Sequence, residues 1–139
     1  MTFGEAVISN GGRFRQTQAH FSAWFGRLQI KLTERARDIV SVELVGAGKF
    51  KLNYVGRETL VRFEYFPTTT ASTRAFIVAY AVDRLDAHSP TYTETFRCPI
   101  DALGNITVAD ANIAGSLQAN EEVLLARILL GTVQGLDHF

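Results

Sequence analysis

Apolar residues recur at helical spacing through the first third of the chain. Successive members of this stripe are three, four or seven positions apart, and they are Phe14, Phe21, Phe25, Leu28, Leu32, Ala36 and Ile39. This period predicts one long amphipathic helix, from about residue 13 to about residue 40. The segment Ser9–Gly12 precedes it, with two candidate N-caps followed by two glycines that suggest a flexible entry.

From Lys49 onward the period becomes two, which is typical of half-buried strands. Apolar and polar residues alternate, with turn residues between the runs, and the predicted strands are Val40–Val45, Lys49–Tyr54, Val61–Tyr65, Ala75–Val82, Tyr92–Cys98 and Ile106–Val108. Pro67 is expected to end one strand, and residues 68–73 are predicted to form a polar hairpin loop. The strand Ala75–Val82 is apolar on both faces, so we expect it inside the sheet and covered on both sides.

A second helix is expected near the C-terminus. Candidate caps occur throughout residues 110–118, but the clearest start is Asn120, which is followed by two acidic residues. Val123–Leu130 is apolar at seven of its eight positions, so this helix is expected to be covered on more than one side. The order of elements predicts a single α+β domain over residues 1–139. A long N-terminal helix packs on a curled antiparallel meander of four to five strands, and a C-terminal helix closes it.

Composition fits one ordered globular domain, with 139 residues, 47% hydrophobic and 20% charged. Cys98 is the sole cysteine, which excludes an intramolecular disulfide and a multi-thiolate metal site. No basic leader precedes an apolar segment, and Val123–Leu130 is too short to span a bilayer. We therefore expect a cytoplasmic protein without a membrane association.

Charge is distributed unevenly, although the formal net charge is zero. Residues 1–57 contain nine Arg or Lys and four acidic residues, giving +5, and residues 58–139 contain five and ten, giving −5. This asymmetry suggests an anionic partner or self-complementary packing. The alternative is that the two halves neutralise each other within one fold.

Acid–base chemistry has one candidate cluster. Asp83, Asp86 and His88 lie on one connection and could exchange protons in a pocket, but aspartates also stabilise turns by bonding their own backbone. The histidines His20, His88 and His138 fall in different elements without metal-ligand spacing. The motifs of nucleotide-binding loops, zinc proteases and serine hydrolases do not occur, so no catalytic residue, cofactor or metal is predicted. Cys98 shares a predicted strand face with Tyr92 and Phe96, which indicates a buried structural thiol.

One flank of the first helix could hold an anion. It carries basic and aromatic side chains beside the apolar stripe: His20, Trp24, Arg27, Lys31 and Arg35. Three bases and an indole could contact phosphates and stack on a base of a nucleotide or nucleic acid. Alternatively, Glu34 and Asp38 pair with these bases on a solvated face, and Trp24 lies at the margin of the core.

A strip of small residues lies opposite the apolar stripe of the same helix: Ala19, Ala23, Gly26 and Ile30. With the two-sided strand and the apolar C-terminal helix, it gives more apolar surface than one helix layer covers, which suggests subunit association. The alternative is that both helices pack over the sheet and use this surface within one chain. Three functions follow as hypotheses: first, a non-enzymatic protein-interaction module, such as an adaptor or inhibitor, acting as a homo-oligomer; second, a binding protein for an anionic ligand; third, a small enzyme using the 83–88 connection.

Overall fold

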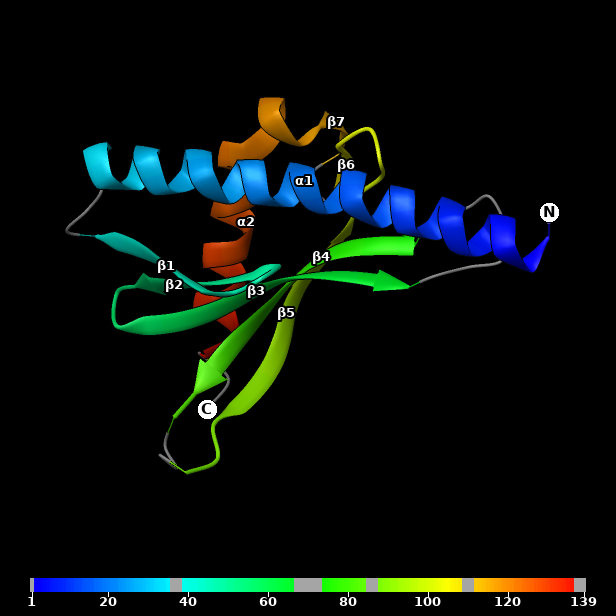
Figure 1. Cartoon of the computed structure of the whole chain (residues 1–139). Helices are drawn as coiled ribbons and strands as arrows, with labels where there is room; N and C mark the ends of the chain where they lie inside the picture. The colour runs from blue at the N-terminus through cyan, green and yellow to red at the C-terminus, as the bar shows by residue number, and fades with distance from the viewer. Residues whose placement is uncertain (1, 36–38, 67–73, 85–87, 109–111, 137–139) are drawn as a thin grey trace.

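A computed structural model describes residues 2–35, 39–66, 74–84, 88–108 and 112–136 of the chain. In these residues two helices and seven strands follow one another in the order α1 (Phe3–Arg35), β1 (Val40–Gly46), β2 (Lys49–Tyr54), β3 (Arg57–Phe66), β4 (Arg74–Asp83), β5 (Thr91–Pro99), β6 (Asn105–Val108), β7 (Ile113–Ser116) and α2 (Leu117–Leu136). The predicted α+β class is confirmed, since an N-terminal helix, a curled antiparallel meander and a C-terminal helix follow one another (Figure 1).

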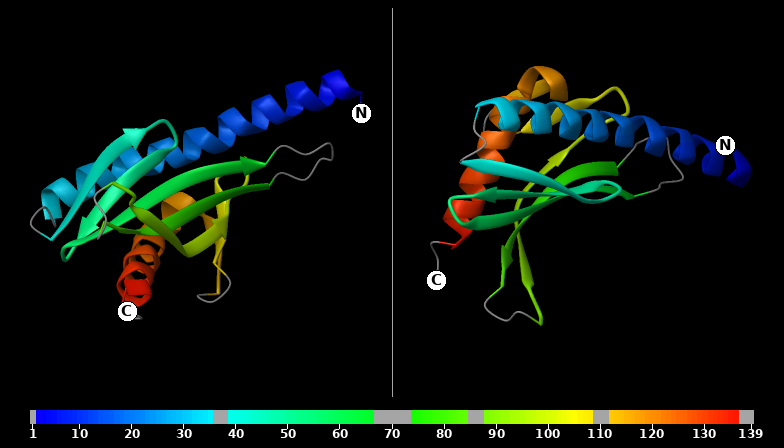
Figure 2. Two further views of the ribbon diagram at one scale, coloured as in Figure 1. Left: turned by 90° about the horizontal axis from the view of Figure 1, so that it is seen from below. Right: turned by 60° about the vertical axis from the view of Figure 1, so that its left-hand side comes forward.

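The main sheet has the strand order β1-β2-β3-β4-β5, and every neighbouring pair is antiparallel. Strands β2 and β3 are joined by a two-residue loop, Val55 and Gly56, in which φ is +47° and +77°. Positive φ at both central residues is the pattern of a type I′ hairpin turn, which matches the twist of the flanking strands. The sheet is strongly twisted, and the long strands β3 and β4 connect its two halves (Figure 2).

Helix α1 begins ten residues earlier than its sequence pattern predicts. Its first turn is closed by a reciprocal capping box, in which the Glu5 backbone N–H donates to Thr2 Oγ1 at 3.2 Å and the Thr2 N–H donates to Glu5 Oε2 at 3.1 Å. The expected flexible entry at Gly11 and Gly12 is therefore wrong, because both glycines lie inside the helix. A tertiary contact supports this extension, since Tyr65 Oη of β3 donates to Asn10 in α1.

The C-terminal region also differs in detail from the expectation. The short strand predicted at Ile106–Val108 is present as β6, but it pairs with β7, which the sequence pattern did not reveal. Helix α2 then begins at Leu117 and not at Asn120, because Ser116 acts as the cap: its hydroxyl accepts from the Ala119 N–H at 3.2 Å. The hairpin loop predicted at residues 68–73 lies outside the described residues.

Both helices pack on the same face of the main sheet. From α1, the Phe21 ring lies 5.5 Å from the ring of Phe50 and 5.9 Å from that of Phe63. From α2, Thr132 Oγ1 lies 2.6 Å from Thr59 Oγ1. Residues 50, 59 and 63 project from one side of the sheet, since Phe50 pairs with Val61, which lies between the other two at two-residue spacing. In Figure 1, α1 crosses above the sheet and α2 descends behind it, so neither helix of the described residues covers the opposite face.

Strand β4 lies inside the sheet, between β3 and β5, as predicted. Its two faces are covered differently, because Ala75, Ile77 and Ala79 face the helices, whereas Phe76, Val78 and Tyr80 lie on the helix-free face. Neither described helix covers this second face, so the expectation that a second layer covers it is not met. Val78 is nevertheless buried there, at 0% exposure.

Candidate functional site

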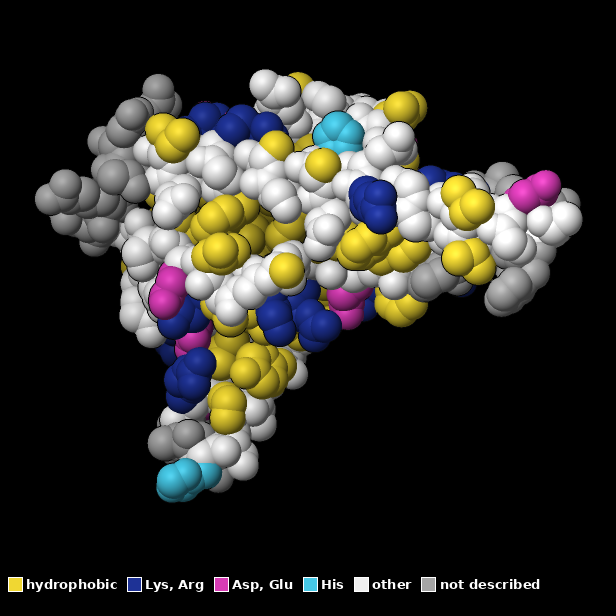
Figure 3. All heavy atoms as spheres, viewed as in Figure 1, with side chains coloured by type: hydrophobic (Ala, Val, Ile, Leu, Met, Phe, Trp, Pro, Cys, Tyr) yellow, Lys and Arg dark blue, Asp and Glu magenta, His cyan; other side chains and the backbone are white. Residues whose placement is uncertain are grey.

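The helix-free face of the main sheet is defined by the strand register. Residues directly opposite each other share a face, so three cross-strand rows can be read from the pairing. The first row joins Asn53, Glu58, Val82 and Tyr92, the second joins Lys51, Leu60, Tyr80 and Glu94, and the third joins Lys49, Arg62, Val78 and Arg97. Figure 3 shows basic and hydrophobic side chains side by side on the face of the sheet below α1.

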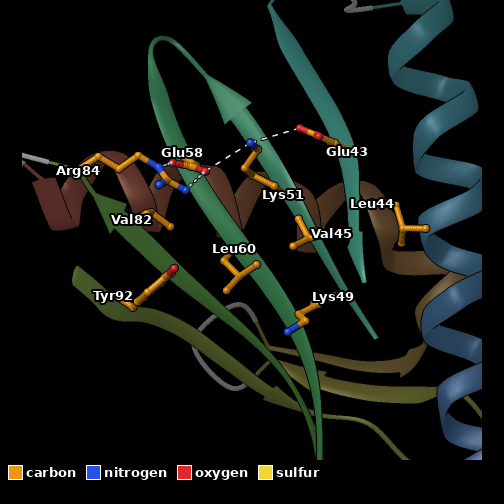
Figure 4. Close-up of a pocket in the computed structure, with 10 residues that line it drawn as sticks. All are labelled: Glu43, Leu44, Val45, Lys49, Lys51, Glu58, Leu60, Val82, Arg84 and Tyr92. Atoms are coloured by element: carbon orange, nitrogen blue, oxygen red, sulfur yellow. Dashed lines mark hydrogen bonds and ion pairs between the residues drawn. The ribbon is translucent and has the colours of Figure 1, made fainter. Parts of the chain in front are cut away.

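A groove of about 370 Å³ lies on this face. Leu60 and Val82 lie on its sheet floor, Tyr92 lies at one side, and the ends of β1 and β2 contribute Val45 and Lys49 (Figure 4). Val45 and Tyr92 are more than half exposed, whereas Leu44 pairs with Phe50 and its side chain points toward α1 in Figure 4. Exposed apolar side chains grouped around a concave surface are characteristic of binding sites.

Ion pairs run along one side of the groove and join β1, β2, β3 and Arg84, the residue that follows β4. Lys51 Nζ lies 3.2 Å from Glu43 and 3.5 Å from Glu58, and the Nε of Arg84 donates to Glu58 at 2.5 Å. The hydrogen bond from Arg84 lowers the pKa of Glu58 although burial raises it, and the hydrogen bond to Glu43 raises the pKa of Lys51. The lowered pKa of Glu58 and the raised pKa of Lys51 keep these two groups charged near neutral pH.

A second network lies farther along the same face. The Tyr80 hydroxyl donates to Glu64 at 3.2 Å, and the Arg97 guanidinium donates to Glu94 at 2.8 Å and to Glu64 at 3.4 Å. Arg97 also lies 4.9 Å from the centre of the Phe76 ring, a cation–π distance. Arg97 is thus held by two carboxylates and a ring.

Lys49 and Arg62 differ from the other cations of this face. They pair directly across β2 and β3, and both side chains are exposed. Among the residues that the structure describes, no carboxylate lies within ion-pair distance of either one. Lys51, Arg84 and Arg97 each have at least one such partner.

A β-bulge places Tyr92 at the groove. Ala79 pairs with Phe96 and Tyr80 with Glu94, so the intervening Thr95 is the extra residue of β5. The bulge reverses the alternation, and Tyr92 opposite Val82 lies on the helix-free face whereas Cys98 opposite Ile77 lies on the other. The expectation that Tyr92, Phe96 and Cys98 share one strand face is therefore wrong for Tyr92.

Three members of the basic flank predicted on the first helix contact other parts of the fold: Trp24, Arg27 and Lys31. Trp24 is fully buried, and its ring lies 5.4 Å from that of Phe50 in an edge-on contact. Arg27 and Lys31 both donate to the buried carboxylate of Glu121 in α2. An anion bound at this flank would therefore compete with Glu121, and Trp24 offers no exposed face for stacking on a base.

Of the two remaining members of that flank, His20 has a described side chain and Arg35 does not. The His20 ring packs against the backbone of Gly104, where a Cβ would lie 2.6 Å from His20 Nδ1. Ion pairs from Arg27 and Lys31 to Glu121, and from Lys51 to Glu58, join the basic and acidic halves of the chain, as the neutralisation alternative expects.

The strip of small residues on α1 lies at the surface. Ala19 and Ala23 are exposed, Ile30 is 62% exposed, and a Cβ built on Gly26 would meet no described heavy atom within 4 Å apart from the adjacent backbone of its own helix. This strip faces away from the core, so it is accessible to a second molecule.

Two of the residues considered for acid–base chemistry, Asp83 and His88, lie outside the lining of the groove. The third, Asp86, lies outside the described residues. Cys98 is buried, and burial raises the pKa of its thiol to about 12. Within the described ranges, no three His, Cys, Asp or Glu side chains are grouped as metal ligands would be.

A smaller pocket of about 140 Å³ lies between the two helices near Glu121, and its lining includes Leu28, Leu32 and Leu125.

No helix in the described part of the chain has the length and apolar character needed to cross a membrane. No protein-family model matches the sequence, and comparisons with curated proteins and with solved structures gave no significant match.

Proposed function

We propose that the protein is a non-enzymatic interaction module, an adaptor or inhibitor, that binds another polypeptide on the helix-free face of its sheet. The observation that supports this function is the groove over Leu60 and Val82, where apolar side chains are accessible beside a row of ion pairs. An apolar centre with a polar rim is the usual composition of a protein interface. The ion pairs connect the rim across β1, β2, β3 and the residue after β4.

The protonation states in the groove favour binding over acid–base catalysis. A general acid or base works best when its pKa lies near the working pH. The pKa of Glu58 is lowered and those of Lys51 and Arg84 are raised, so each is displaced away from neutrality. The buried thiol of Cys98 is not available as a nucleophile at neutral pH.

Self-association is the second part of this proposal. The strip of Ala19, Ala23, Gly26 and Ile30 would allow the α1 helices of two copies to approach closely, because its side chains are small. Light scattering after size-exclusion chromatography should give a mass above the 15.4 kDa of one chain. Gly26→Arg should reduce the mass to that of a monomer, and a monomeric wild-type protein at micromolar concentration would contradict this part.

Peptide binding tests the proposed site. Display selection from a library of short random peptides against the wild-type protein should enrich binders, whose affinity is then measured by fluorescence polarisation. Leu60→Asp should weaken the selected peptides by about tenfold or more, since it places a charge on the apolar floor. The matched control is Leu130→Asp on α2, a residue that is 51% exposed and lies outside both proposed surfaces, which should leave the affinity unchanged. If the selected peptides bind Leu60→Asp as tightly as the wild type, the proposed site is wrong.

A further inference from the structure

Two like charges face each other across the hairpin of β2 and β3 at the groove. Lys49 and Arg62 are a directly opposite cross-strand pair, with Cα atoms about 4.5–5.5 Å apart in such pairs. Like charges in this position destabilise a sheet. Since no described carboxylate pairs with either residue, the fold itself gains nothing evident from this arrangement. A negatively charged group from outside would turn the repulsion into attraction.

The cation pair and the apolar groove form one continuous surface. Lys49 lines the groove and projects toward its floor (Figure 4). Arg62 lies two residues from Leu60 on the same face of β3, a separation of about 6.6 Å along a strand. An extended chain has the same repeat, so its residues i and i+2 can reach the two places together.

We propose that the occupant of the groove is an extended acidic segment of a protein. One of its carboxylates lies between Lys49 and Arg62, and an apolar side chain two residues away packs over Leu60 and Val82. This inference rests on the proposed function and names the partner that the same site selects. Two cations on adjacent strands can hold one carboxylate by charge-assisted hydrogen bonds.

The surrounding charges favour a peptide over a polyanion. Glu43 and Glu58 flank the apolar floor, and Glu64 and Glu94 lie near Arg97 on the same face. A nucleic acid would bring several phosphates against these carboxylates, whereas a single acidic side chain meets only the unpaired cations. The accessible apolar floor also suits a side chain and not a phosphate backbone.

The experiment uses the peptides selected by display against the full-length wild-type protein. They should carry Asp or Glu two positions from an apolar residue, and their affinity should fall with rising salt. Arg62→Glu and Lys49→Glu should each weaken binding by about tenfold or more, whereas Arg62→Lys should keep most of it. The matched control is Arg15→Glu on the exposed surface of α1, which makes the same charge change away from the groove and should have no effect.

Stability provides a second, independent readout. Arg62→Gln should raise Tm by about 1–3 °C, because it removes the cross-strand repulsion. A variant that is more stable and yet binds the peptide less well cannot be explained by misfolding.

The outcomes separate this inference from the proposed function. If peptides bind Leu60→Asp more weakly but bind Arg62→Glu as well as the wild type, the groove remains the binding site and the inference of an acidic partner is wrong. Enrichment of basic peptides, or stronger competition by single-stranded DNA than by the acidic peptide, would overturn it as well. A dimer that Leu60→Asp and Arg62→Glu convert to monomer would identify a second copy as the occupant instead. No enrichment at all would overturn both proposals.

Discussion

The Nε–H of Arg27 in α1 donates a hydrogen bond of 2.7 Å to the carboxylate of Glu121 in the first turns of α2. Lys31, one turn farther along α1, donates to the other oxygen of the same carboxylate. Glu121 is buried at 7% exposure, while the two bases remain partly exposed. This contact fixes the two helices relative to each other on their shared face of the sheet.

Loss of this carboxylate should loosen the helix pair. We expect Glu121→Ala to lower the free energy of unfolding by about 1–3 kcal/mol, because it leaves two cations without their partner. Solvent screens part of this loss, since Arg27 and Lys31 are partly exposed. Glu122→Ala is the matched control, since this neighbour is exposed and should change stability by less than about 0.5 kcal/mol. Chemical denaturation measures both values. Equal effects of the two substitutions would contradict a special role for Glu121.

The same carboxylate should make stability depend on pH. Burial raises the pKa of Glu121, but hydrogen bonds from Lys31 and Arg27 outweigh it and leave the pKa below its ordinary value of 4.5. A lowered pKa in the folded state stabilises the protein above the ordinary value, and this stabilisation is lost as the pH falls through the lowered one. Glu121→Gln should therefore lose less stability on acidification than the wild type. The free energy of unfolding of both proteins is measured from neutral to acidic pH. An equal loss in the wild type and in Glu121→Gln would contradict this linkage.

The hairpin turn at Val55 offers a stabilising change. Val55 has φ of +47° and is 63% exposed, so a β-branched residue occupies the left-handed region without burying its side chain. Asn-Gly is the favoured pair for a type I′ turn. Val55→Asn should therefore raise the free energy of unfolding by about 1 kcal/mol. A thermal melt that shows no gain, or a loss, would indicate that Val55 makes a contact that compensates for its strain.

The Cys98 thiol should be inert in the folded protein. Its side chain is buried, and the raised pKa of about 12 leaves almost no thiolate at pH 8. Ellman's reagent should therefore react with it only as the protein unfolds, at a rate that increases with denaturant concentration. Rapid labelling of the native protein would show that Cys98 is accessible and would reopen a nucleophilic role.

The indole of Trp24 combines a large apolar contact with an unpaired polar group. Trp24 is fully buried, and its Nε1–H has no hydrogen-bond partner in the described structure. Trp24→Phe removes this buried donor, which offsets the loss of ring volume. We expect a change in stability below about 1 kcal/mol, whereas Phe50→Ala in the same cluster should cost about 3–5 kcal/mol. A cost for Trp24→Phe close to that of Phe50→Ala would reveal a partner for the indole.

The period of apolar residues was sufficient to locate β1 to β6 but not β7, and Phe50, Leu52 and Val61 are buried on the expected side. The start of α1 was missed because Gly11 and Gly12 resemble a break in the pattern, although Thr2 and Glu5 carry the spacing of a capping box. A low helix propensity at two glycines was overridden by this cap and by the contact of Asn10 with Tyr65.

The candidate site could be predicted only in part. Alternation places Lys49 and Lys51 on the face of β2 that Phe50 does not occupy. The two-residue loop at Val55 then fixes the register that pairs Lys49 with Arg62. The extra residue in β5 has no comparable signal, so Tyr92 was assigned to the wrong face. That both helices occupy one face depends on contacts such as Arg27 with Glu121, which are far apart in the chain and leave no local pattern.

Methyl chemical-shift mapping tests most directly whether the helix-free face is the binding surface. Selectively methyl-labelled wild-type protein is titrated with the acidic peptide obtained by display selection. We expect the methyl resonances of Leu60, Val78 and Val82 to shift in a saturable way, while those of Ile30 on α1 and Leu130 on α2 stay unchanged. Shifts confined to Ile30 or Leu130, or none on the helix-free face, would contradict it.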